Sequence, residues 1–94
     1  MREYIATFHT HLAALMTSRS LTALGIRAQM LPVPRKLSSS CGTCVRYTAE
    51  DPNLNAMDED VEGVYEKISN DAYILLMEKI RQLLSPMGGG SDQF

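Results

Sequence analysis

Residues 4–25 read YIATFHTHLAALMTSRSLTALG, and this stretch carries the signals that decide the fold. Its first part, Tyr4 to His9, is a short and nearly continuous apolar run, which is typical of a strand covered on at least one face. Thr10 then offers a side-chain oxygen that can cap a helix, and Gly25 tolerates the left-handed conformation in which helices often end. The stretch therefore predicts a strand followed directly by a helix.

Apolar side chains recur at helical spacing inside the predicted helix, and we expect them to pack inward. They are Leu12, Leu15, Met16 and Ala23. The sequence outside this stretch predicts further strands at Ile26–Val33, Val45–Thr48 and Val61–Ile68, with Gly63 as a bulge or close approach, and a short helix from Pro52 to about Met57. A last amphipathic helix is predicted to begin at one of Ser69, Asn70 and Asp71 and to carry Ala72, Tyr73, Leu76, Met77, Ile80, Leu83 and Leu84.

The element order βαββαβ with an extra C-terminal amphipathic helix predicts a ferredoxin-like α+β sandwich. Residues 1–85 would form its single domain and residues 86–94 a flexible tail. The apolar stripe of the last helix would either cover the core or form a homodimer surface. In such a fold the ends of the first two strands meet at one edge, which would bring His9, Thr10, His11 and Cys41 together.

The composition excludes several classes of function. Ninety-four residues suffice for one small domain, and the formal net charge of −2 gives no general attraction to nucleic acid or to an anionic membrane. No apolar run reaches the roughly 18 residues that a membrane span needs. We therefore expect a cytoplasmic protein with neither nucleic acid nor membrane as its partner.

Both cysteines of the chain, Cys41 and Cys44, lie in one Cys-x-x-Cys motif behind a run of serines. In a reducing cytosol this spacing indicates thiols that are free, reactive or metal-bound in preference to a structural disulfide. Small neighbours leave Cys41 the less covered of the two, so it is the expected nucleophile. Cys44 is the expected resolving partner.

The residues around the motif suit an anionic sulfur. Arg35, Lys36 and Arg46 flank the pair and would lower a thiol pKa, although as surface cations they could equally be solvated charges. Hydroxyl and backbone donors come from three small residues, which are Ser39, Ser40 and Gly42. His9 and His11 are candidates for a proton relay to the thiol.

Two alternatives use the same residues. Cys41 and Cys44 could alternate between dithiol and disulfide as a redox module. With His9 and His11 they could instead form a closed tetrahedral zinc site in a small interaction module, although the spacing is not that of a standard finger. We expect no metal and no cofactor, and a carrier or binding protein in preference to a catalyst.

The chain also resembles a known family in the order of its motifs. The matching segments are Phe8-His9-Thr10, Gly25-Ile26, Leu31-Pro32-Val33-Pro34-Arg35, Ser39-Ser40-Cys41-Gly42, Val45-Arg46-Tyr47 and Val61-Glu62-Gly63-Val64-Tyr65. Across roughly residues 3–67 they resemble small bacterial proteins described as selenium/sulfur carrier-like, formerly a domain of unknown function. The combination of Pro-x-Pro-Arg with Ser-Ser-Cys-Gly is the specific part of the match. Cys44 and the helix expected after residue 68 depart from the family pattern.

The resemblance implies a carrier role for Cys41, the cysteine of the Ser-Ser-Cys-Gly motif. Cys41 would accept sulfur or selenium as a persulfide or selenosulfide from a donor such as a cysteine desulfurase and pass it to an acceptor protein. Cys44 would assist release by closing a disulfide. The choice between sulfur and selenium and the identity of the acceptor stay open.

Overall fold

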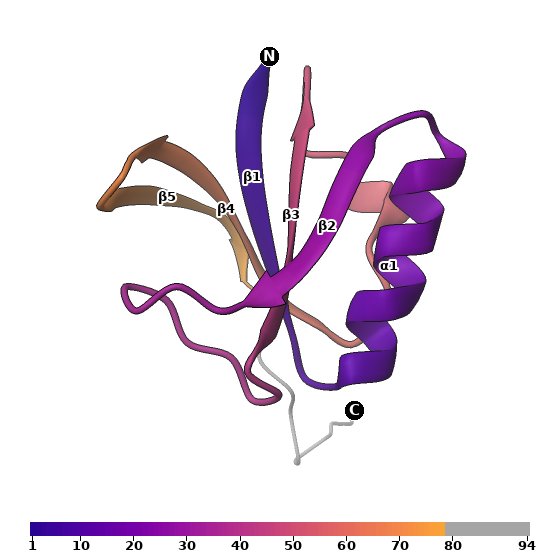
Figure 1. The fold of residues 1–94 in the computed structure, drawn as a ribbon, viewed down its shortest axis with the longest axis horizontal. Coiled ribbons are helices and arrows are strands. Elements are labelled where there is room, and N and C mark those ends of the chain that lie inside the picture. Colours follow the sequence, from indigo (N-terminus) through magenta and orange to yellow (C-terminus); the bar gives the residue numbers. More distant parts are fainter. Residues whose placement is uncertain (79–94) are drawn as a thin grey trace, which may run out of the picture.

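The computed structural model describes residues 1–78 as an antiparallel sheet with one α-helix packed on it (Figure 1). The elements are β1 (Arg2–Phe8), α1 (His11–Ala23), β2 (Arg27–Pro32), β3 (Thr43–Ala49), the 3-10 turn η1 (Leu54–Ala56), β4 (Val61–Ser69) and β5 (Ala72–Glu78). The sheet has the order β2-β3-β1-β4-β5, and each neighbouring pair is antiparallel. The prediction of an α+β protein is confirmed.

Helix α1 begins and ends where the sequence predicts. The side chain of Thr10 accepts a hydrogen bond of 3.1 Å from the Ala13 amide, and Gly25 follows the helix with a φ of +82°. The predicted apolar stripe, however, is on the wrong face, because Leu12 is 63% exposed and Met16 is 46% exposed. The buried positions are instead Ala13, Ala14, Thr17 and Leu21. Three of these four positions carry small side chains, and Leu21 supplies the one large apolar side chain among them.

The core lies between α1 and one face of the sheet. Alternate residues of β1 and β3 point toward the helix, and Tyr4 and Tyr47 stack there with ring centroids 5.3 Å apart. The opposite face carries Ile5, Thr7 and Cys44, which are also buried. In residues 1–78 no helix covers that second face, and no helix is long and apolar enough to cross a membrane.

The predicted last helix is wrong for residues 72–78, which form strand β5. Ser69 pairs with Ala72, so only Asn70 and Asp71 form the turn between β4 and β5. Asn and Asp favour tight hairpin turns as well as helix caps. Here residues 72–78 pair with β4, so Asn70 and Asp71 form a hairpin turn. The expected helix positions Ile80, Leu83 and Leu84 lie outside the described residues.

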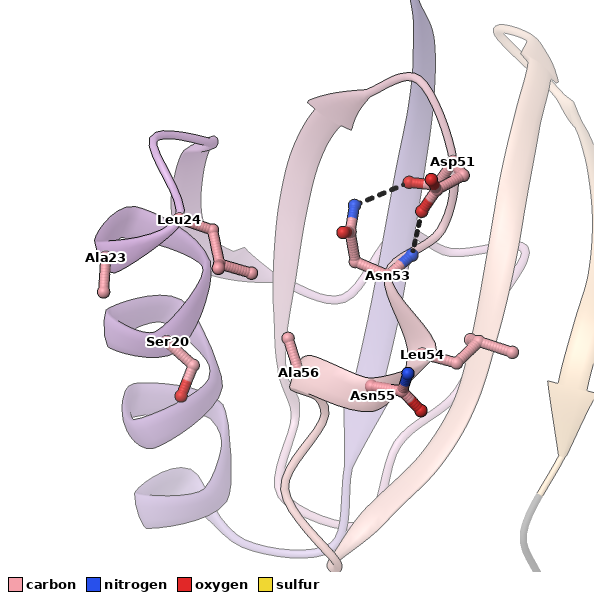
Figure 2. Close-up of a pocket in the computed structure, with 8 residues that line it drawn as sticks. All are labelled: Ser20, Ala23, Leu24, Asp51, Asn53, Leu54, Asn55 and Ala56. Atoms are coloured by element: carbon pink, nitrogen blue, oxygen red, sulfur yellow. Dashed lines mark hydrogen bonds between the residues drawn. The ribbon is translucent and has the colours of Figure 1, made fainter.

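A short segment stands where a ferredoxin-like sandwich would have its second helix. The helix predicted from Pro52 to Met57 is reduced to the single turn η1, entered through Asn53 in the left-handed conformation. Beside it, an open cleft of about 720 Å³ separates η1 from the C-terminal end of α1 (Figure 2). The described residues therefore form a five-stranded sheet with one α-helix packed on it. The sequence predicts a sandwich with two helices instead.

Candidate functional site

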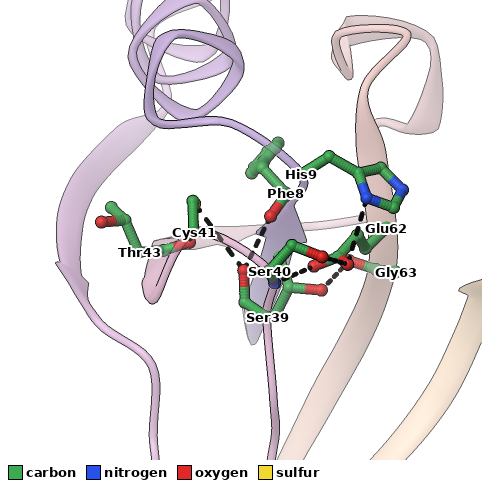
Figure 3. A network of polar contacts seen from close by, with 9 residues as sticks. Phe8, His9, Ser39, Ser40, Cys41, Thr43, Glu62 and Gly63 are labelled. Carbon is green, nitrogen blue, oxygen red and sulfur yellow. Dashed lines mark hydrogen bonds and ion pairs between the residues drawn. The ribbon is translucent and has the colours of Figure 1, made fainter.

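The connection between β2 and β3, residues 33–42, is called the Cys41 loop here. A backbone hydrogen bond joins its first and last residues where the two strands end. The amide of Val33 donates to the Gly42 carbonyl at 3.2 Å, and Gly42 takes a φ of +75°, which only glycine adopts without strain. The Ser39 hydroxyl donates to the carbonyl of Phe8 at 2.7 Å. These contacts place the loop at the end of β1 (Figure 3).

A β-bulge in β4 supplies the main polar partner of the loop. Thr7 pairs with Gly63 and Phe8 with Val61, so Glu62 is an extra residue in the ladder. The Glu62 carboxylate accepts hydrogen bonds from the Ser40 amide at 2.9 Å and from the Ser40 hydroxyl at 2.6 Å. Figure 3 shows this carboxylate lying between the loop and His9.

The sequence-based reasoning missed Glu62 as a site residue. The available signal was Gly63, which was expected to mark a bulge or a close approach. A Cβ atom at Gly63 would lie 3.3 Å from both the Met77 carbonyl oxygen and the Tyr65 ring, so the close approach is real. The bulged residue is its neighbour Glu62, and its contact with Ser40 joins residues 22 apart in the chain.

The environment of Glu62 favours its ionised form. Partial burial by itself raises the pKa of this carboxyl. The hydrogen bonds from the side chain and backbone of Ser40, a further one from the Ser39 side chain and the neighbouring His9 together outweigh burial and lower the pKa below its usual value. A carboxylate that accepts several hydrogen bonds is stabilised as the anion. Glu62 is therefore a charged acceptor for the loop at neutral pH.

The Cys41 thiol is half-buried and has two oxygen neighbours. Its sulfur donates to the Thr43 carbonyl at 3.5 Å and lies 3.7 Å from the hydroxyl oxygen of Ser39. The Ser39 hydroxyl also donates to the Phe8 carbonyl at 2.7 Å, and in the contact between Ser39 and Cys41 either side chain can be the donor. The Cys41 sulfur therefore has a hydroxyl and a backbone carbonyl within hydrogen-bonding range.

Cys44 has a different environment. It lies inside β3, one residue after the strand begins, and is fully buried, with its sulfur donating to the Pro32 carbonyl at 3.7 Å. Burial raises the pKa of this thiol to about 11; nearby Cys41 adds to the rise, and the positive charge of Arg46 opposes it. Both cysteines are free. Only Cys41 is partly open to solvent.

The two histidines lie at the same end of the sheet as Cys41, but neither touches its sulfur. His9 places its Nδ1 atom 3.2 Å from the Glu62 carboxylate. The Nδ1 atom of His11 is 3.4 Å from the hydroxyl of Thr43, the residue whose carbonyl accepts from Cys41. Each histidine is thus connected to the loop through one intermediate residue.

The three candidate cations do not gather at the Cys41 sulfur. Arg46 donates to Gln29 at 3.1 Å and lies 3.6 Å from the Glu3 carboxylate. Arg35 and Lys36 are exposed on the Cys41 loop, and within residues 1–78 neither is seen in a hydrogen bond or ion pair. Across the same described residues, no cluster of three or more His, Cys, Asp or Glu side chains is arranged to hold a metal ion.

Comparison with known families identifies the chain. The sequence profile of the family described as "Putative Se/S carrier protein-like" matches residues 3–67, which include the whole Cys41 loop and its partners in β1 and β4. The chain belongs to this family. The match ends before the hairpin turn, so β5 lies outside the family segment.

A curated relative matches a shorter segment of the chain. The chain is 31% identical over 48 residues to "Uncharacterized protein YtiA" of Escherichia coli strain K12. This match covers 51% of the chain and 56% of the relative, so it spans little more than half of that protein. No solved structure matches the chain.

Proposed function

We propose that this family member is a carrier that accepts sulfur or selenium on Cys41. The observation that carries the proposal is the contrast between the two thiols, of which Cys41 is half-exposed on a loop and Cys44 is fully buried. A carrier must meet a donor protein and an acceptor protein in turn, and only Cys41 can reach either without unfolding of a strand. The family description agrees with this chemistry.

Loading is a sulfane transfer without net oxidation or reduction. The Cys41 thiolate attacks the outer sulfur of a persulfide on a donor such as a cysteine desulfurase. A new S–S bond forms on Cys41, the S–S bond of the donor breaks, and the donor cysteine leaves as a thiolate that recovers the proton released by Cys41. With selenium as cargo, the same attack gives a selenosulfide.

Donor groups for the loaded anion come from the loop itself. Ser39 can supply its hydroxyl proton by turning away from Phe8, and the amide groups next to Gly42 lie in a strongly turned segment that suits an anion. Arg35 and Lys36, exposed on the same loop, are assigned to the terminal sulfur or to the partner surface. Arg46 acts on Cys44, whose pKa it lowers against the stronger effect of burial.

Release is assigned to Cys44. Its thiolate attacks the Cys41 sulfur and expels the outer atom as hydrosulfide, so two thiols are oxidised to a disulfide while the sulfane sulfur is reduced. Since Cys44 is buried and its pKa is near 11, this step needs the start of β3 to move away from Pro32. The persulfide on Cys41 therefore stays intact until an acceptor protein moves the start of β3 and exposes Cys44. The same burial disfavours the alternative of a rapidly cycling redox pair.

The free state of both thiols fits a reducing compartment, and we place the carrier in the cytoplasm. The acceptor takes up the released hydrosulfide, and a cytoplasmic dithiol protein reduces the Cys41–Cys44 disulfide before the next loading. Neither nucleic acid nor a membrane enters this proposal, because the chain has a formal net charge of −2.

Mass spectrometry after incubation with a cysteine desulfurase and cysteine tests the proposal. The expected product carries one extra sulfur atom on Cys41. The Cys44→Ser protein should load equally well and hold its sulfur longer, whereas Cys41→Ser should stay unloaded. An unmodified wild-type chain after exposure to an active desulfurase would contradict the carrier function.

A further inference from the structure

We propose that Glu62 is a positioning residue that fixes the Cys41 loop against β4 and so sets how the Cys41 sulfur meets a partner. The proposal rests on the carrier function proposed above. It adds a residue that makes no contact with the sulfur and that acts through Ser40, the residue directly before Cys41.

The geometry of the bulge supports this role. In a regular antiparallel ladder, the β4 partners of Thr7 and Phe8 would be consecutive residues. Here the partners are Gly63 and Val61, and Glu62 is the extra residue between them. Its two carboxylate oxygens accept separately, one from the Ser40 amide at 2.9 Å and the other from the Ser40 hydroxyl at 2.6 Å. Two bonds to one residue fix both its backbone and its side chain, and therefore also the backbone that leads into Cys41.

Ser39 provides a second anchor on the other side of the same turn. Its hydroxyl donates to Phe8 at 2.7 Å, and its carbonyl accepts from the Gly42 amide at 3.3 Å. Ser39 and Ser40 thus attach the loop to two adjacent strands, β1 and β4. Between these anchors and the start of β3, the freedom of Cys41 is limited to its side chain.

Glu62 suits positioning better than proton transfer. Its pKa is lowered, so the carboxylate is a weak base for a thiol proton. The titratable group paired with it is His9 from the end of β1, and Tyr65 from its own strand feels the charges of both Glu62 and Glu78 of β5. The negative charges of Glu78 and Glu62 both help to raise the pKa of Tyr65, after burial as the main cause. The side chain that lies near both groups is Ser39, which contributes to the lowered pKa of Glu62 and has its hydroxyl oxygen 3.7 Å from the Cys41 sulfur.

Three substitutions separate positioning from charge. Glu62→Gln keeps the size of the side chain but replaces one accepting oxygen with a donor. Glu62→Asp keeps the charge but shortens the reach to Ser40. Ser40→Ala keeps the charge and the amide contact and removes only the hydroxyl bond. The control is Glu66→Gln, because Glu66 lies on the same strand with its side chain 21% exposed, against 20% for Glu62, and its carboxylate pairs with Arg2, away from the Cys41 loop.

Three measurements are made on each full-length protein: hydrogen exchange of the Ser40 amide relative to buried β1 amides, the alkylation rate of Cys41 by iodoacetamide across pH, and sulfur loading by a cysteine desulfurase. Since a hydrogen bond to a charged group shifts a local equilibrium by roughly 10- to 100-fold, Glu62→Gln and Glu62→Asp should speed Ser40 exchange by about tenfold or more. Both variants should raise the plateau that the rate of Cys41 alkylation reaches at high pH. Both should also slow sulfur loading by about tenfold. Ser40→Ala should change all three in the same directions by less, and Glu66→Gln should match the wild type.

The opposite signs of the alkylation and loading changes identify positioning, because a merely destabilised chain would change the exchange of all amides together. The Ser40 amide chemical shift should also titrate in acid with Glu62 in the wild type and lose that titration in Glu62→Gln. The proposal is overturned if Glu62→Asp behaves as wild type while Glu62→Gln does not, since charge alone would then explain the effect. It is also overturned if both variants load normally. If no protein loads, wild type included, while exchange and alkylation change as expected, the carrier function fails and the positioning role stands.

Discussion

The hydroxyl oxygen of Ser39 lies 3.7 Å from the sulfur of Cys41, and the same hydroxyl donates to the carbonyl of Phe8 at 2.7 Å. One serine therefore serves two purposes at once. It anchors the Cys41 loop to the end of β1, and it lies beside the sulfur as a hydrogen-bond partner. In the proposed carrier, a hydrogen bond from Ser39 to the loaded sulfur would compete with its bond to Phe8.

Substitution of the anchor should cost stability. Ser39→Ala removes a partly buried hydrogen bond to Phe8 and leaves the carbonyl to find water, so the free energy of unfolding should fall by about 1 kcal/mol. Urea denaturation measures this change. Ser38→Ala is the matched control, because Ser38 is exposed on the same loop, and it should fall within about 0.5 kcal/mol of the wild type. Equal stabilities of the two variants would show that the Phe8 contact contributes nothing.

The two thiols should differ in their rates of alkylation. With a pKa near 11, Cys44 carries very little thiolate at about pH 8, and it is also fully buried. In the folded protein, iodoacetamide should label Cys41 about 100-fold or more faster than Cys44. Peptide mass spectrometry at timed intervals gives both rates, and labelling in urea should bring them close together. Comparable rates without urea would contradict the buried position of Cys44.

Alkaline pH should reveal the energetic cost of burying Cys44. Between about pH 9 and pH 11 the unfolded chain releases this thiol proton while the folded chain keeps it, so the free energy of unfolding should fall as pH rises. The fall from this group amounts to about 2 kcal/mol at most. Denaturation across this range should show a shallower decline in Cys44→Ala than in the control Cys41→Ala. Tyr47, whose pKa is also raised mainly by burial, remains in both variants and does not affect the comparison.

Acid should weaken the attachment of Glu62 to the loop. Because the pKa of Glu62 is lower in the folded protein, its contribution is present above the unfolded value of 4.5 and is lost as pH falls through the folded value. Relative to wild type, Glu62→Gln should be less stable by about 1 to 2 kcal/mol at neutral pH. The difference should shrink as pH falls below about 4, as urea titrations at several pH values can measure. A constant difference across this range would mean that ionisation of Glu62 is not involved.

Local signals were enough to predict some of the fold. Thr10 and Gly25 act on their immediate neighbours, and the helix begins and ends with them. The spacing of large apolar residues such as Leu12 predicts the wrong face of that helix, since the face packed on the sheet carries Ala13 and Ala14. Asn70 and Asp71 suit a helix cap or a hairpin turn equally well, and only pairing with a distant strand separates the two.

The candidate site was predictable only in part for the same reason. Cys41 and its serines form one continuous motif and could be read directly from the sequence. The burial of Cys44 follows from its place in β3 beside Thr7 of β1, a pairing that no local pattern contains. Glu62 joins the site across 22 residues through a break in strand register. An alternating apolar and polar pattern predicts a regular strand, and it does not show where a strand contains a bulge such as the one at Glu62.

The bulge in β4 has a further consequence, for how this site could arise or disappear. If residue 62 were deleted, Val61 would directly precede Gly63, and their pairings with Phe8 and Thr7 would form an uninterrupted ladder. The sheet could therefore exist with or without the inserted residue. The scaffold and the attachment of the loop are separable, so a shortened homologue could keep the whole sheet and yet leave its cysteine loop unattached.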